Sequence, residues 1–267
     1  MKARVLGMGL WMPGFPDPAS WLSGRPVEGA DAPNAQSKQR RRSSLLVNMV
    51  ADVAAQASAQ AGVPLSRLRV VVGSAFGELT TLMEMLEERE RDGLLSPLRF
   101  QNSVHNSAAG QLSIANKNKT PAMSLAAGND TVAMVLLEAL TLLALGGDEV
   151  LAVVADEPLP QSIRPGHVTG AVSAALVLAA DGASGDAARP ALAVLEDLRQ
   201  AQAAFGSVER PQEVDGPCAA ILPLIAALAQ GRSGRIDVSP KEDPRWTILV
   251  RDARLVRDAR GPEGASA

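Results

Sequence analysis

The side chains that most often carry catalysis or bind metals are few in this chain and far apart. It has two histidines, His105 and His167, and one cysteine, Cys218, so the closely spaced ligands of a zinc site are missing. The string Gly73 to Gly77 has a glycine directly before Ser74, whereas the elbow of a serine hydrolase reads GxSxG. The chain has no tyrosine for acid catalysis. We therefore expect no metal site and an inert, buried thiol at Cys218.

A glycine pair near the N-terminus raises the question of nucleotide binding. Gly7 and Gly9 lie in a first predicted strand, Arg4 to Leu10, and superficially match the start of a dinucleotide-binding turn. Met12 replaces the third glycine of that motif, and Pro13 follows where a helix should begin. We expect close backbone approach at the two glycines rather than a bound cofactor.

The hydrophobic pattern predicts the elements that would position such residues. We expect strands at 4–10, 68–73, 122–126, 149–155, 170–180, 190–196 and 246–250, and helices at 43–61, 79–93, 107–115, 132–145 and 218–229. This alternation is typical of the α/β class. The helix at 132–145 is apolar on nearly every face, which predicts a place inside the core. Asn129, Asp130 and Thr131 precede it and are expected to cap it.

Several separated strings carry a family resemblance. They are residues 73–78, 96–100, 103–114, 121–125 and 155–160. In this order they resemble the N-terminal half of a β-ketoacyl synthase, and more closely the short ketosynthase-like subunits called chain length factors in aryl-polyene-type pathways. The resemblance implies a thiolase-like half-fold, with a mixed, mainly parallel sheet and helices on both faces. We expect a β-ketoacyl synthase-like domain at 1–200 and a short C-terminal appendage with a frayed tail at 201–267.

The resemblance also implies where a nucleophile would stand. Active ketosynthases present a cysteine at the N-terminus of a buried helix, and counting from Pro121 places that position at Asn129, which cannot form a thioester. The family's two catalytic histidines belong to a C-terminal half that is essentially absent here, and His105 and His167 match neither of them. Asn129 is then a vestigial nucleophile position. Four residues are expected to line a vestigial pocket or acyl tunnel: Asn129, Asp130, Phe100 and His105.

The function implied by the resemblance is that of a non-catalytic chain length factor. Such a subunit pairs with a catalytic β-ketoacyl synthase in type II polyketide, aryl-polyene or fatty-acid-like biosynthesis. It needs no cofactor of its own, since phosphopantetheine arrives on an acyl carrier protein. The heterodimer is expected to form through an edge strand, Ala122, Met123, Ser124 and Leu125. The basic residues Arg40, Arg41 and Arg42 could steer an acidic carrier, meet a partner subunit or simply keep the surface solvated.

Two other functions fit the same residues. The half-fold could serve as a stand-alone acyl-binding or regulatory protein that has lost its partner. It could also be a hydrolase with a new serine nucleophile, for instance Ser103 or Ser107.

Composition argues against a disordered chain, a nucleic-acid-binding protein and a membrane protein. With 46% hydrophobic and 21% charged residues the chain should fold, and a net charge of −3 argues against nucleic-acid binding. The longest apolar stretch, 132–145, contains Glu138 and falls short of the ~20 residues that span a bilayer. The segment Met1 to Leu6 enters a strand without the apolar run of a signal peptide, so we expect a cytoplasmic protein.

Overall fold

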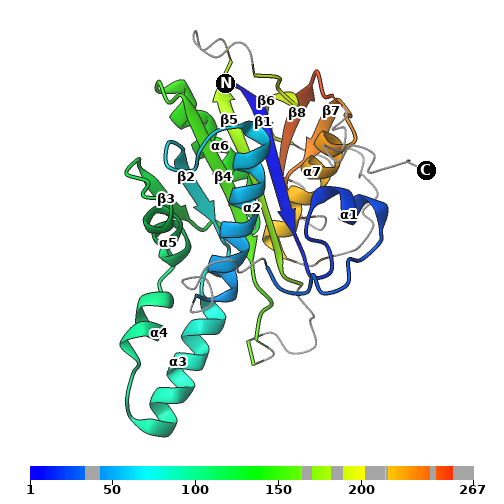
Figure 1. Cartoon of the computed structure of the whole chain (residues 1–267). Helices are drawn as coiled ribbons and strands as arrows, with labels where there is room; N and C mark the ends of the chain where they lie inside the picture. Colours follow the sequence, from blue (N-terminus) through cyan, green and yellow to red (C-terminus); the bar gives the residue numbers. More distant parts are fainter. Residues whose placement is uncertain are drawn as a thin grey trace, which may run out of the picture.

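The structure is a computed structural model that describes residues 1–33, 43–160, 162–163, 170–181, 189–201, 214, 216–240 and 245–254. The elements follow one another as β1 (Lys2–Trp11), α1 (Pro18–Ser23), α2 (Leu45–Ala61), β2 (Arg69–Gly73), α3 (Leu79–Asp92), α4 (Pro97–Asn102), α5 (Ser107–Ala115), β3 (Ala122–Leu125), η2 (Gly128–Asp130), α6 (Thr131–Ala144), β4 (Glu149–Asp156), β5 (Val172–Ala180), β6 (Ala193–Gln200), η3 (Pro217–Ile221), α7 (Leu222–Ala229), β7 (Gly234–Asp237) and β8 (Trp246–Arg251). Figure 1 shows a central sheet with helices on both faces, as predicted.

The described strands form one mixed sheet in the order β3-β2-β4-β5-β1-β6-β8-β7. Only the pairs β2–β3 and β2–β4 are parallel in the part of the sheet that the structure describes, and the other five pairs are antiparallel. The expectation of a mainly parallel sheet is therefore wrong. Parallel neighbours need a long crossover, usually a helix, and no helical pattern separates β4, β5 and β6.

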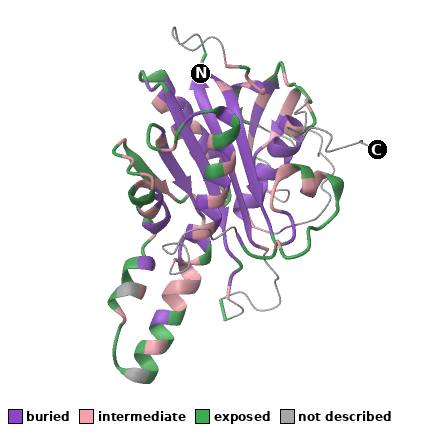
Figure 2. Cartoon of the chain, in the orientation of Figure 1, coloured by how far each residue is buried: buried purple, intermediate pink, exposed green. Residues whose placement is uncertain are grey.

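Alternation along the central strands assigns side chains to two apolar layers. On β4, Val150 and Ala152 face one layer while Leu151 and Val153 face the other. The first layer contains α6, η3 and α7, and the second contains α2 and α5. Figure 2 shows the central strands of the sheet as buried and the edge strand β3 as largely exposed. Helix α6 lies in the core, as its apolar sequence predicts.

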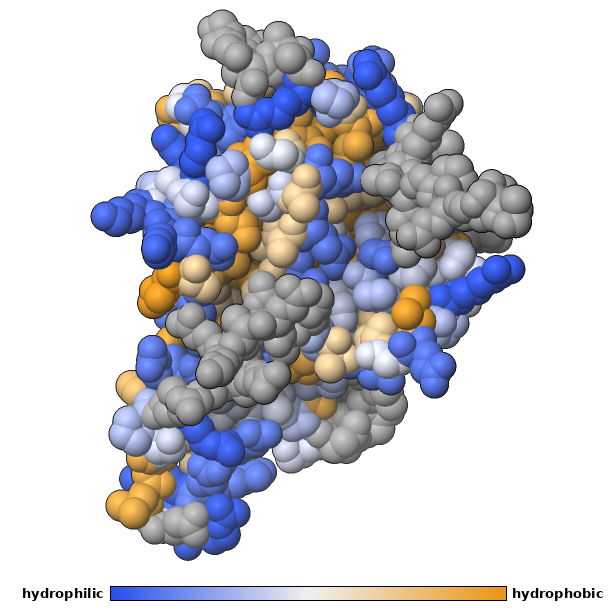
Figure 3. Space-filling view, in the orientation of Figure 1, coloured by the Kyte–Doolittle hydropathy of each residue, from blue (hydrophilic) through white to orange (hydrophobic). Residues whose placement is uncertain are grey.

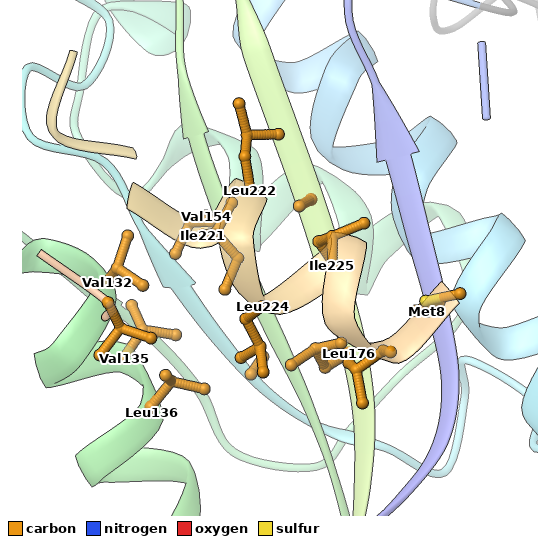
Figure 4. Packing of buried hydrophobic residues seen from close by; sticks show 14 of the residues in the cluster. Met8, Val132, Val135, Leu136, Val154, Leu176, Ile221, Leu222, Leu224 and Ile225 are labelled. Carbon is orange, nitrogen blue, oxygen red and sulfur yellow. The ribbon is translucent and has the colours of Figure 1, made fainter. Parts of the chain in front are cut away.

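The segment after Gln200, expected as an appendage, adds its described elements to this same sheet and core. Strand β8 pairs with β6 from Val194 to Gln200, and β7 pairs with β8. Leu224 of α7 lies between Leu136 of α6 and Leu176 of β5 in the view of Figure 4. The tail at 261–267 is outside the described residues.

The two N-terminal glycines allow α2 to lie directly on β1. A Cβ atom built on Gly7 would stand 2.2 Å from the carbonyl oxygen of Ala57, and one built on Gly9 would stand 2.4 Å from that of Val53. Neither position has room for a side chain. The prediction of close backbone approach is confirmed.

Helices α3 and α4 form a hairpin that projects from the body at the lower left of Figure 1. Arg99 on α4 ties the two helices together through ion pairs with Glu84 at 2.9 Å and Glu88 at 3.1 Å. Apart from this hairpin the described helices pack against the sheet, and none of them has both the length and the apolar character needed to cross a lipid bilayer.

Candidate functional site

The turn between β3 and α6 presents Asn129 to solvent. Gly128 adopts a left-handed conformation, with a φ of 54°, and η2 leads directly into α6. The Thr131 hydroxyl accepts from the Ala127 amide at 3.1 Å and donates to the Gly128 carbonyl at 2.7 Å. This single buried side chain closes the turn from both sides. An exposed amide thus stands at the start of a helix whose body is in the core.

Capping at this turn differs from the expectation for Asn129 and Asp130. Asp130 occupies the N-cap position of α6, but its side chain makes no capping hydrogen bond. Its Oδ2 atom lies 3.8 Å from the Arg245 guanidinium, while Oδ1 is buried without a partner among the described residues. Thr131, the last of the three expected capping residues, supplies the side-chain hydrogen bonds of this turn.

A buried polar network joins the carboxyl ends of β2 and β4 to η3. Asp156 accepts hydrogen bonds from the Ser74 hydroxyl at 2.9 Å, from the Ala75 amide at 2.9 Å and from the Cys218 amide at 3.1 Å. Burial raises the pKa of the Asp156 carboxyl, and the hydrogen bonds from Cys218 and Ser74 oppose that rise. Because η3 also contacts η2, this network lies on the buried side of the turn that holds Asn129.

Cys218 is fully buried within that network. Burial raises the pKa of its thiol well above the ordinary value, and the nearby charge of Asp156 adds to the rise. A thiol of this kind is neither ionised nor reachable by a substrate. Its burial agrees with the expectation of an inert cysteine.

His105 is a structural neighbour of Ser74 rather than a base for it. Its Nε2 atom lies 3.1 Å from the Ser74 carbonyl oxygen, which can only accept, so Nε2 is the donor. The Ser74 hydroxyl donates to Asp156. His167 lies outside the described residues.

The two serines considered as alternative nucleophiles are each engaged locally. The Ser103 hydroxyl donates to the Phe100 carbonyl at 3.0 Å, at the end of α4. The Ser107 hydroxyl accepts from the Gln111 side chain at 3.1 Å, and Ser107 is buried. In the described part of the chain neither hydroxyl has the histidine contact that would activate it.

The residues expected at a partner surface lie on an edge of the sheet. Among the described strands β3 pairs only with β2, so its second edge is open. Ala122 and Met123 are exposed, and Ser124 and Leu125 are half-buried. Phe100, expected to line a tunnel, is exposed on the projecting helix α4. The turn of Asn129 lies on a different element, between β3 and α6. Arg40, Arg41 and Arg42 lie outside the described residues.

Sequence reasoning missed two buried glutamates beside this region. Glu78 and Glu157 are 2% and 5% exposed, and both stand at the first turn of α3. They belong to the strings 73–78 and 155–160 that carry the family resemblance, but nothing in those strings indicates their burial. The described residues bring no three histidine, cysteine or acidic side chains into an arrangement that could hold a metal ion.

The architecture is that of thiolase-like ketosynthases: a mixed α/β sheet with α2 and α6 on opposite faces, and a tight turn ahead of the buried helix α6. The sequence model of the family described as β-ketoacyl synthase, N-terminal domain, matches residues 20–246. The chain therefore belongs to this family.

Solved structures give the same fold. The ketosynthase ApeO in complex with its chain length factor ApeC, from Xenorhabdus doucetiae, matches with a TM-score of 0.67 and 21% identity over 93% of this chain and 99% of the matched chain. The ishigamide ketosynthase/chain length factor matches with a TM-score of 0.76 and 13% identity over 95% and 100%. The type II polyketide synthase complex AntDE:AntF matches with a TM-score of 0.64 and 14% identity over 74% and 68%. No curated protein sequence matches the chain.

Proposed function

We propose that this chain is a chain length factor, a non-catalytic subunit that pairs with a catalytic β-ketoacyl synthase. The observation that carries the proposal is Asn129, an exposed amide on the turn before the buried helix α6. The resemblance puts the nucleophilic cysteine of active ketosynthases at this position. An amide forms no thioester, and the chain's own thiol, Cys218, is sealed in the core.

The surface of the chain supports a partner of the same fold. Strand β3 has an open edge, and an open edge in a natural protein is normally covered. The hairpin on the same side of the molecule carries exposed apolar side chains, and Figure 3 shows a hydrophobic patch at its far end. The exposed apolar residues of this surface are Leu86, Leu94, Leu95, Phe100, Val104 and Met123. We call these six residues and the β3 edge the partner surface.

The proposed division of labour follows from what condensation requires. Acyl transfer needs a thiolate, and the carbon–carbon bond then needs groups that promote decarboxylation and stabilise an enolate. In our proposal the synthase supplies all of these. This chain completes the dimer and, through Asn129, Asp130, Phe100 and His105, shapes the tunnel that receives the acyl chain.

The remaining parts of the proposal concern delivery. A carrier protein brings phosphopantetheine, so this chain needs no cofactor, and Arg40 to Arg42 steer the acidic carrier or partner. The pathway is of the type II polyketide, aryl-polyene or fatty-acid-like class, in the cytoplasm. The similar structures described as ketosynthase/chain length factor and carrier-protein complexes support this class.

The test is co-expression with the ketosynthase encoded beside this chain. We expect a one-to-one complex by light scattering, and extended products by mass spectrometry when the complex receives acyl and malonyl carrier proteins. Replacing the synthase cysteine with alanine should abolish extension, whereas Asn129→Ala in this chain should leave it active. Extension that survives loss of the synthase cysteine would overturn the proposal.

The same preparation separates the two alternative functions. A stable monomer that binds acyl groups and ignores the synthase would identify a stand-alone binding protein. Thioester hydrolysis by the chain alone, lost in Ser103→Ala or Ser107→Ala, would identify a hydrolase.

A further inference from the structure

The root of the hairpin α3–α4 contains two acidic side chains in an unusual setting. Glu78 and Glu157 are both almost completely buried, yet no ion pair of the described residues reaches either of them. A buried carboxylate without a cation is costly, and the cost grows when a second one lies nearby. The question is how the fold tolerates two of them at one helix end.

Glu78 is the better satisfied of the two. It is the N-cap residue of α3, and its Oε1 and Oε2 atoms accept hydrogen bonds from the Ser44 hydroxyl at 2.6 Å and the Thr81 hydroxyl at 2.9 Å. Ser44 itself caps α2, since its hydroxyl accepts from the Val47 amide at 3.2 Å. Glu78 therefore joins the start of α3 to the start of α2.

Glu157 is supplied by fewer donors. It follows β4, and its Oε1 atom accepts from the Thr80 amide in the first turn of α3 at 3.2 Å. The Thr80 hydroxyl donates to the neighbouring Pro158 carbonyl at 3.3 Å. Glu157 thus joins the start of α3 to the end of β4. A carboxyl group bonded through Thr80 alone among the described residues is the natural place for a proton when a neighbour bonded through both Ser44 and Thr81 stays ionised.

Among the residues that the structure describes, the charged groups around the pair do not neutralise it. On α2 the only ionisable residue is Asp52, and α5 has none. On α4, Arg99 is engaged by Glu84 and Glu88. Asp156 points to the other side of β4, where Ser74 and Cys218 hold it.

The other described titratable groups that pack against this region add no positive charge to the pair. His105 is bonded to the Ser74 carbonyl, and Cys218 is a buried, neutral thiol. Glu84, one turn further along α3, is acidic and opposes a second negative charge.

We propose that Glu78 and Glu157 together keep one proton near neutral pH, and that this proton fastens the first turn of α3, and with it the hairpin, to the sheet. With Glu157 neutral, the first turn of α3 carries one anion, which the helix dipole favours. With both ionised, two buried like charges oppose each other where α2, α3 and β4 meet. The hairpin then opens more readily.

The stability of the closed hairpin falls as the pH rises, because the pKa of Glu157 is raised. Burial and, next, the charge of Glu78 raise this pKa from 4.5 to about 7, and burial also raises that of Glu78. A raised pKa means that the closed state holds a proton that the open state releases. The contribution to stability is complete below about pH 4.5 and is lost as the pH rises through about 7. If the hairpin also belongs to the partner surface, assembly inherits this pH dependence, and that last consequence alone rests on the proposed function.

Hydrogen exchange measured by mass spectrometry on the full chain tests the proposal without any partner. After correction for the intrinsic exchange rate, the opening equilibrium of residues 79–92 should rise by about tenfold between pH 6 and pH 8, which is the linkage expected for one such proton. Glu157→Gln keeps an acceptor for the Thr80 amide but cannot ionise, so its opening equilibrium should change little over this range. The matched control is Glu90→Gln, an exposed carboxyl on the same helix, which should behave like wild type.

Each other outcome also decides the question. A pH-independent opening of α3 in wild type, or the same pH dependence in Glu157→Gln as in wild type, would overturn the proposal. If Glu157→Gln does not fold, Glu78→Gln serves instead, because removing the neighbouring charge should shift the midpoint of the wild-type transition to lower pH. An unshifted midpoint in that variant would count against the proposal.

Discussion

At the scale of single residues, our proposal makes the turn of Asn129 a former nucleophile site. We expect Asn129→Cys to gain slow acylation by a reactive thioester, because the start of α6 favours a thiolate, although the adjacent Asp130 carboxylate opposes ionisation. Wild type should stay unmodified, since Cys218 is buried. Intact-mass spectrometry measures the modification, and Ser66→Cys, on an exposed loop, gives the background rate.

The same variant should not extend an acyl chain. Extension needs a second group that drives decarboxylation, and His105 is held by the Ser74 carbonyl. Incubation of Asn129→Cys alone with acyl donor and malonyl carrier protein should therefore give no extended product. Extended product would show that the half-fold carries its own catalytic set, and the chain length factor hypothesis would fail.

The Gln56 side chain of α2 supplies a hydrogen bond that the end of β1 does not find in the sheet. Strand β6 pairs only with Lys2 to Val5 of β1, so the later amides of β1 need other acceptors on that side. The Gln56 amide oxygen accepts from the Leu10 amide at 3.1 Å, and its nitrogen donates to the Pro16 carbonyl at 2.8 Å.

Gln56→Leu should therefore lower the free energy of unfolding by about 1–3 kcal/mol, the cost of buried polar groups left without partners. Urea denaturation measures it. Gln60→Leu is the matched control on the same helix: Gln60 accepts from the Met8 amide at 2.7 Å but is itself exposed, so water can replace it and the loss should be smaller. An equal loss of stability in both variants would contradict the prediction, because it would show that water reaches the Leu10 and Met8 amides to the same extent.

At the scale of elements, β3 is the strand whose open edge the proposed partner would cover. The carbonyls of Pro121 and Leu125 accept from β2, so the backbone groups of Ser124 point to the open edge. Ser124→Pro removes a backbone donor from this edge, so we expect the heterodimer to be lost in size-exclusion chromatography. Ser124→Thr is the control, because it keeps the donor and suits a strand. A normal heterodimer in the proline variant would show that the partner does not pair with β3.

The elements that could be predicted are those with long periodic patterns. Helix α2 begins two residues after the predicted start and ends at the predicted residue, Ala61. The elements that were missed are short: α1, α4 and β7 have six residues or fewer, which is too few for a period to show. Start signals were nonetheless present, since Asp17 precedes Pro18 and Ser96 precedes Pro97.

Strand direction and part of the site could not be predicted because they depend on contacts between distant segments. The described residues between the consecutive strands β4, β5 and β6 contain no helix, but which strands become neighbours in the sheet depends on contacts that no local pattern indicates. The turn of Asn129 and a capping role for Thr131 were predicted from the sequence, but the hydrogen bond from the Ala127 amide to Thr131 was not. The burial of Glu157 depends on Thr80, a residue 77 positions away, so no local pattern indicates it.

At the scale of the whole molecule, the two ends of the sheet differ in what they expose. Both edge strands have four residues, but the β3 edge lies on the same side as the projecting hairpin in Figure 1. Large exposed apolar patches on natural proteins mark interaction sites. We therefore expect the chain alone to self-associate as its concentration rises, and the partner to suppress this.

Leu94 and Leu145 allow a matched test, because each is 77% exposed but only Leu94 belongs to the partner surface. Neither substitution by serine should change folding stability beyond about 0.5 kcal/mol, since both side chains are already in solvent. Burying a leucine at an interface contributes about 1.5–3 kcal/mol, and about 1.4 kcal/mol changes a dissociation constant tenfold. Leu94→Ser should thus weaken binding to the synthase by about tenfold or more, measured by titration calorimetry, and should reduce self-association in sedimentation velocity.

Leu145→Ser should change neither measurement by more than about twofold, because it lies at the end of α6, outside the partner surface. Equal effects of the two substitutions would show that the partner does not cover the hairpin, and that the apolar residues at its tip have a purely local role.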